Sequence, residues 1–346
     1  YNRNKGFSTD MYLRVKTQDG SVLDEVSLKK NLDIFLSQPS VNAVDEWGLV
    51  GDEKKEYDEI ARKKQDMKSA GQDKGKEYKE LTKRQKEILQ KSNDNIPEEA
   101  NPKKMNEKTT QSATTFYENV SQEQHSKLQE LDENDEDYIA SLSKTTGQAK
   151  DYCRALVKTM KSLKHPYSRE ELRQAMIDNG FNSKKTVGKY QDKFSVMMMR
   201  TLSGEPINDE SAKEDLNKHL QIGKDFNKSF VENMVKEPYK SGVMGTIREK
   251  FPLKSLMDGE EKMSLGGVNA DPEVMKEIFG TTDYDKVQEK LSVQGPDDKG
   301  EYQLVFQAEV GGDVVPISTI APRQRGLGYE PVVNLEMNLH LVMKEK

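Results

Sequence analysis

Cysteine, tryptophan and long apolar runs are scarce in this chain of 346 residues. Cys153 is the single cysteine, which excludes an intrachain disulfide and a zinc site built from several cysteines. No apolar run approaches the roughly 20 residues that a membrane-spanning helix needs, and no signal peptide is visible. We therefore expect no membrane partner and a location in the cytoplasm or another reducing intracellular compartment. Cys153 itself lies in an apolar helical pattern, so we expect a buried structural thiol.

Apolar residues are few and charged residues are many. Each class makes up 33% of the chain, whereas an average domain has roughly 25% charged residues and about 45–50% apolar ones. This composition predicts thin cores and long exposed helices. The net charge is only −6, from 60 acidic and 54 basic residues, which provides no general attraction for nucleic acid. Because the chain begins with Tyr1 and not with Met, we expect a fragment of a longer polypeptide.

Residues 168–202 contain the most complete local pattern of the chain. Ser168 with Glu171 three residues later predicts a capping box at the start of a helix. Gly180 is typical of a helix end, because glycine adopts the left-handed conformation without a steric clash. A second helix is then predicted by apolar residues at helical spacing, which are Val187, Tyr190, Phe194, Met197 and Met198. Helix, short turn and helix is the layout of a helix-turn-helix unit.

Two sets of side chains are the candidates for a nucleic-acid contact. In a helix-turn-helix reader, residues near the start of the second helix reach phosphates and base edges. Arginines on a loop between two strands would bind phosphate through the bidentate guanidinium fork. The candidates are Lys184, Lys185, Lys189 and Gln191 on the second helix, and Arg323 and Arg325 on the loop. The alternative interpretation is a solvated face of a helical bundle and a solvated strand connection.

The first 115 residues divide into two regions. Residues 1–50 should form a β-hairpin around Asp19-Gly20 and then a short helix over residues 28–36, with Trp47 in a small core. Residues 51–115 form a charged spacer, with 16 basic and 14 acidic residues between positions 51 and 110. Its apolar seam is interrupted, which favours a broken helix or a loose helical hairpin around Gly71. Residues 92–115 have few apolar side chains and two prolines, so we expect an exposed linker there.

The remaining residues should form a helical core and a sheet. Residues 116–240 contain apolar stripes of helical period, strongest over residues 147–163. Residues 241–346 begin with short helices, expected at 243–250, 253–257, 272–279 and 284–291. Strict alternation then predicts antiparallel strands over 301–310 and 332–343, with a third strand at 314–320 between them. Pro316 should place that third strand at a sheet edge or at a bulge.

Catalytic and metal-binding patterns are lacking. The four histidines are far apart along the chain, without the spacing of a zinc site. No glycine-rich loop carries the lysine and hydroxyl of a phosphate-binding motif. We therefore expect no catalytic residue, no metal and no cofactor, and we lean against an enzyme.

The expected fold class is α+β and predominantly helical. It combines an N-terminal β-hairpin, a helical core with a helix-turn-helix-like unit, and a C-terminal antiparallel β-meander. The favoured function is a non-enzymatic structural or protein-interaction module of a larger protein or assembly, with a protein partner or a second copy of the chain. The alternative is a nucleic-acid-binding module that uses residues 168–202.

Overall fold

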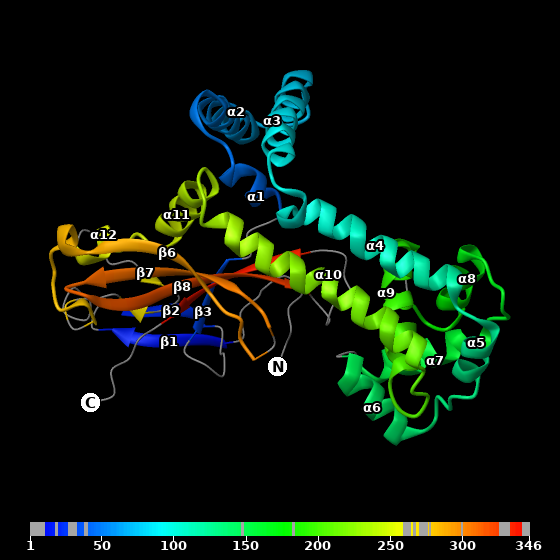
Figure 1. Ribbon diagram of the computed structural model, residues 1–346. Coiled ribbons are helices and arrows are strands. Elements are labelled where there is room, and N and C mark those ends of the chain that lie inside the picture. Colours follow the sequence, from blue (N-terminus) through cyan, green and yellow to red (C-terminus); the bar gives the residue numbers. More distant parts are fainter. Residues whose placement is uncertain are drawn as a thin grey trace. The chain divides into compact units, whose positions relative to one another are not determined.

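The computed structural model describes most of the chain in two compact units. The described residues are 11–17, 20–26, 33–37, 41–146, 149–181, 184–258, 264–265, 268–269, 276, 278–298, 300–324 and 333–340. One unit contains Tyr1–Ile96, Val231–Ala321 and Leu335–Lys346, and the other contains Pro97–Phe230 and Pro322–Asn334. We call them the sheet unit and the helical unit. The α+β class is confirmed, and helices are the dominant elements (Figure 1).

The helical unit is a bundle around one apolar core. Its core residues come from every α-helix that the unit contributes, and they include Phe116, Leu128, Leu156 and Leu172. In chain order its elements are η1 (Glu98–Ala100), α4 (Pro102–Asn119), α5 (Gln122–Gln129), α6 (Glu136–Thr146), α7 (Lys150–Ser162), α8 (Arg169–Asp178), α9 (Lys184–Ser203) and α10 (Glu210–Met234), the last as far as Phe230.

Helix α9 is the centre of this bundle. It packs against α4, α5, α6 and α8. Its second half is buried almost completely, at Phe194, Val196, Met197, Met198, Met199 and Leu202. The three consecutive methionines therefore fill the core, as expected from their flexible side chains. The same core contains Cys153 of α7, which is fully buried as predicted.

The prediction of an exposed linker over residues 92–115 is wrong. Helix α3 (Lys76–Asp94) continues into this stretch, and η1 and α4 occupy most of the rest. The Asn101 side chain caps α4 by accepting the Lys103 and Lys104 amides at 2.9 and 3.3 Å, and Pro102 occupies a tolerated first position. The low apolar content was misleading because small or polar residues, Thr109 and Ala113, share the buried face of the helix with Met105 and Phe116.

Several helices belong to the sheet unit. They are α1 (Val41–Trp47), α2 (Gly51–Ser69), α3, α11 (Tyr239–Lys250) and α12 (Leu253–Met257). Helices α2 and α3 form the helical hairpin expected from the charged region, and they turn at Gly71, whose φ of +70° favours glycine. Trp47 is 3% exposed, so its predicted core position is confirmed. No helix among the described residues is long and apolar enough to cross a membrane.

The main sheet has five strands in the order β3-β9-β8-β7-β6. The strands are β3 (Asp33–Ser37), β6 (Gln288–Gln294), β7 (Gln303–Val310), β8 (Asp313–Gln324) and β9 (Val333–His340). The three strands expected from alternation are present as β7, β8 and β9. Strand β8 is interior, and Pro316 lies at a register shift opposite Phe306 and Gln307. The sequence predicted a sheet edge or a bulge for Pro316, and the bulge is confirmed. A bulge tolerates proline because it does not need the missing N–H.

Two expected helices are strands instead. The prediction of a short helix at 28–36 is wrong for the described residues 33–37. These residues form β3, which pairs antiparallel with β9, with Ile34 opposite Leu339. The helix at 284–291 is also wrong, because only the 3-10 turn η2 (Tyr284–Lys286) precedes β6, and Leu291 pairs with Phe306 of β7. Both short apolar runs fit a helical period and a strand period, and pairing with another strand decides between the two. The helix expected at 272–279 lies largely outside the described residues.

Two small hairpins complete the sheet unit. Strands β1 (Met11–Thr17) and β2 (Gly20–Val26) pair antiparallel, with Thr17 opposite Gly20. This is the predicted N-terminal hairpin. Strands β4 (Ser264–Leu265) and β5 (Val268–Asn269) form the second hairpin.

Candidate functional site

The helix-turn-helix layout of residues 168–202 is present in the helical unit. The Ser168 hydroxyl accepts the Glu171 amide at 3.2 Å, and Glu171 accepts the Ser168 amide at 2.7 Å, so the capping box is complete. Helix α8 ends before Gly180, whose φ of +99° matches the predicted left-handed turn. Helix α9 starts at Lys184 and packs against α8.

The candidate nucleic-acid contacts fall at the margin of what the structure describes. Lys184, Lys185, Lys189 and Gln191 all belong to the first half of α9, but their side chains lie outside the described residues. The expected loop position of Arg323 is wrong, because by backbone position it is the second-last residue of strand β8, which extends further than the alternation predicted. Arg325 lies outside the described residues. The second half of α9 is core, so a reader surface would be restricted to its first half.

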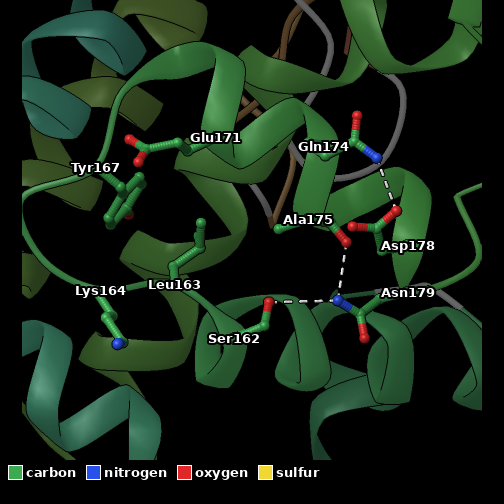
Figure 2. A pocket seen from close by; sticks show the side chains of 9 residues that line it. All are labelled: Ser162, Leu163, Lys164, Tyr167, Glu171, Gln174, Ala175, Asp178 and Asn179. Atoms are coloured by element: carbon green, nitrogen blue, oxygen red, sulfur yellow. Dashed lines mark hydrogen bonds between the residues drawn. The ribbon is translucent and has the colours of Figure 1, made fainter.

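A groove lies next to the helix-turn-helix unit. It has a volume of about 360 Å³ and lies between the end of α7 and one face of α8 (Figure 2). This volume is within the roughly 300–1,000 Å³ of small-molecule sites. The lining residues are Ser162, Leu163, Lys164, Tyr167, Glu171, Gln174, Ala175, Asp178 and Asn179.

Side-chain hydrogen bonds fix the α8 side of this groove. The Asn179 amide nitrogen donates to the Ala175 carbonyl at 2.8 Å and to the Ser162 hydroxyl at 3.3 Å (Figure 2). The Gln174 amide nitrogen donates to Asp178 at 2.7 Å. These bonds connect the last turns of α7 and α8, where helix carbonyls lack intrahelical donors. Hydrogen bonds among the lining residues therefore hold the α8 wall of the groove in place.

Glu171 of α8 and Lys164 after α7 also line the groove. Glu171 accepts the Ser168 amide and hydroxyl, and these hydrogen bonds hold the pKa of the Glu171 carboxyl below its usual range. Glu171 is therefore ionised at neutral pH. Lys164 is exposed, and the described part of the chain offers it no ion pair. The groove thus presents two carboxylates, Glu171 engaged in the cap and Asp178 bonded to Gln174, and one ammonium that meets solvent.

A cluster of four rings lies behind the groove, and Tyr167 belongs to both. The His125 ring centroid lies 5.8 Å from that of His165 and 5.2 Å from that of Tyr167. Tyr117 completes the cluster, with its ring 5.5 Å from Tyr167 and nearly perpendicular to it. Such edge-to-face packing is favourable between aromatic rings.

Burial changes the acidity of this cluster. His125 is 2% exposed, and loss of solvation lowers its pKa, helped by the nearby His165, although the bond to the Leu163 carbonyl opposes this shift. Burial also raises the pKa of Tyr117 to about 12. His125 and Tyr117 are therefore both uncharged at neutral pH.

Sequence reasoning missed both the groove and the histidine pair. His125 belongs to α5 and His165 to the connection after α7, so no periodic pattern relates them. The groove arises where the ends of two helices meet, and each of its residues has a local explanation in capping or exposure. The capping box at Ser168 and Glu171 was the one signal that pointed to this region.

Neither a group of metal ligands nor a similar protein assigns a function to this groove. Among the residues that the structure describes, no group of three or more histidine, cysteine, aspartate or glutamate side chains could hold a metal ion. Comparisons of the chain with protein-family models, curated proteins and solved structures found no match.

Proposed function

We propose that this chain is a non-enzymatic structural or protein-interaction module whose contact surface is the α2–α3 hairpin. One observation carries the proposal. Each helix has 19 residues, yet Ile60 is the single buried residue of α2, and Ile88 is the single buried apolar residue of α3. Most helices of proteins are stabilised by burying an apolar face. A hairpin about 28 Å long that buries so little leaves most of its surface for a partner.

The base of the hairpin is anchored to its own unit. The Ser92 hydroxyl donates to the Asp45 carbonyl at 2.6 Å, and the Tyr239 hydroxyl donates to the Ser92 carbonyl at 3.4 Å. Leu49 joins Ile60 and Ile88 in a small apolar cluster. The hairpin is therefore attached through α1 and α11 at one end, which suits a protruding contact element.

The outer part of the hairpin is held by polar contacts. Lys63 pairs with Glu77 at 2.6 Å, and Arg84 binds both carboxylate oxygens of Glu56 at 2.6 and 2.9 Å. Exposed ion pairs of this kind contribute little to stability, but they display charges of both signs. A mixed pattern favours a protein partner with complementary charges over nucleic acid, which needs a positive surface.

A shortened hairpin tests this proposal. Deleting residues 63–69 and 76–82 together removes seven residues from each helix and keeps the turn, so the remaining seam stays in register. The full chain should show partner capture or self-association in light scattering across a concentration series, and the shortened chain should lose it. A matched control changes two exposed lysines of α10, Lys213→Gln with Lys218→Gln. A full chain that stays monomeric and captures no partner, or a shortened chain that keeps every contact, contradicts the proposal.

The alternative proposal is a nucleic-acid-binding module. The completed layout of α8, Gly180 and α9 is the observation that favours it, while the burial of the second half of α9 counts against it. Fluorescence polarisation with duplex and single-stranded DNA at low and moderate salt provides the test. Binding should weaken steeply with salt. A combined change of Lys184, Lys185 and Lys189 to glutamine should abolish it, with the α10 lysine variant as control. No binding at low salt rejects this alternative.

A further inference from the structure

Two segments of the helical unit hold each other through histidine side chains. The first segment runs from Val120 into α5 and carries His125, and the second follows α7 and carries His165. His125 Nε2 lies 2.9 Å from the Leu163 carbonyl oxygen, and His165 Nε2 lies 2.7 Å from the Val120 carbonyl oxygen. Each segment therefore contributes one ring and one carbonyl, and the bonds are reciprocal. We call this arrangement the histidine clasp.

The carbonyl partners determine the tautomer of both rings. A carbonyl oxygen only accepts hydrogen bonds, so each Nε2 must carry the proton. In a neutral ring, Nδ1 then has a lone pair and no hydrogen. The His125 Nδ1 is buried and has no hydrogen-bond partner in the described structure. A second proton on His125 would have to reside at this atom, without an acceptor and out of water.

Among the described residues, no carboxylate bonds to His125. His165 lies on the adjacent segment, and its protonation would add a like charge beside the first. Tyr117 of α4 and Tyr167 after α7 contribute neutral rings, and Met198 of α9 accepts the Tyr167 hydroxyl at 3.4 Å. Two nearby charged side chains are already paired, Lys127 with Asp209 and Lys161 with Glu133.

We infer that the histidine clasp is a proton-operated switch that holds the groove between α7 and α8 in its closed shape at neutral pH. The clasp and the groove share residues. The Leu163 carbonyl accepts from His125 and also from the Gln129 amide at 2.8 Å, while the Leu163 and Tyr167 side chains line the groove. Protonation of His125 disfavours the closed clasp, releases the segment that carries Leu163 and Tyr167, and changes the groove wall.

The sign of the pH effect follows from the burial of His125. Its pKa in the folded chain is below the ordinary value of 6.5, so the unfolded or open chain binds more protons as the pH falls. The clasp is then fully stabilised above pH 6.5, and its stability is lost progressively as the pH falls from 6.5 to the lowered pKa. Within that window one proton changes the opening equilibrium by about ten-fold per pH unit.

Nitrogen-detected NMR of the histidine rings in the full chain tests the inference directly. At pH 7.5 the His125 ring should be neutral with the proton on Nε2. The amides of Ser121 and Lys164, which follow the two accepting carbonyls, should shift between pH 7.5 and 5 with the same midpoint as the His125 ring. A His125 ring with its proton on Nδ1 at pH 7.5 overturns the inference, and so do Ser121 and Lys164 amides that do not follow His125.

A glutamine variant separates proton binding from structure. His125→Gln keeps a neutral donor near the Nε2 position but cannot take up a proton, so its unfolding equilibrium should lose the ten-fold dependence between pH 6.5 and the lowered pKa. His219→Gln is the matched control, because His219 is also buried in this unit but bonds to Ser112. In this control the Ser121 and Lys164 amides should still follow the His125 ring as in the wild type. If His125→Gln and the wild type respond equally to pH, the clasp is not the switch. If the variant does not fold, the NMR titration of the unmodified chain decides.

Discussion

The indole N–H of Trp47 donates to the hydroxyl of Thr246 at 2.8 Å, although 199 residues separate them. This bond connects α1 to α11, two helices of the sheet unit that are far apart along the chain. Gly242, one turn before Thr246, lies directly against the Trp47 backbone. The single tryptophan therefore orders a contact between two helices and is not a free surface residue.

A pair of glycine variants tests this contact. A Cβ at position 242 would come within 2.4 Å of the Trp47 Cα and carbonyl oxygen, whereas a Cβ at position 245 would meet nothing within 4 Å. Gly242→Ala should lower the free energy of unfolding by about 1–3 kcal/mol through overpacking. Gly245→Ala on the same helix should raise it by roughly 0.5–1 kcal/mol, because alanine favours the helix. Denaturant titrations of both variants measure the difference, and equal effects would show that α1 and α11 do not pack in this way.

The hairpin should respond locally to the loss of its small core. Ile88 is 2% exposed and is one of three residues in the cluster at the hairpin base. Ile88→Ala should reduce local stability by about 2–5 kcal/mol and increase amide exchange throughout α2 and α3. Glu56→Gln removes the exposed pair with Arg84 and should change exchange much less. Hydrogen-exchange mass spectrometry compares the two, and a larger effect of Glu56→Gln would contradict the small-core interpretation.

Asp209 should make the helical unit sensitive to acid. It caps α10 by accepting the Ala212 amide at 3.0 Å, and it also binds Gln124 and Lys127. Burial raises its pKa, but these hydrogen bonds and the lysine charge outweigh burial, so the pKa is lowered overall. Its stabilisation is present above the ordinary carboxyl pKa and is lost as the pH falls through the lowered value.

Two substitutions at this position separate capping from charge. Asp209→Ala should lower the free energy of unfolding at pH 7 by about 1–2 kcal/mol through loss of the cap. Asp209→Asn retains a capping oxygen and should cost less at pH 7. Unfolding titrations from pH 7 to pH 3 should show a smaller pH dependence for both variants than for the wild type. An unchanged pH dependence would exclude Asp209 as a contributor.

The buried thiol should report the unfolding of the helical unit. Cys153 is fully buried in the core of the bundle. A thiol reagent should therefore react slowly with the folded chain and rapidly in denaturant, with a rate that follows the unfolded fraction. Rapid labelling without denaturant would contradict the position of α7 in the core.

The sequence predicted several elements because their causes are local. The capping box of Ser168 and Glu171 involves neighbouring backbone groups, and the apolar stripe of α7 follows from one helical period. The Gly180 turn depends on a backbone conformation that favours glycine. By contrast, α4 was missed because Thr109 and Ala113 were not recognised as core residues before a bundle was present to cover them.

Strand pairing and the candidate site depend on the tertiary structure. Residues 33–37 form a strand because β9, about three hundred residues away, offers its edge, and Pro316 is accommodated by a bulge that only the paired register reveals. His125 and His165 become partners because α5 and the end of α7 pack together. The sequence by itself determined the α+β class, the helix caps and the strand alternation. The tertiary structure decided which surfaces meet, because burial and pairing depend on residues that the local chain does not contain.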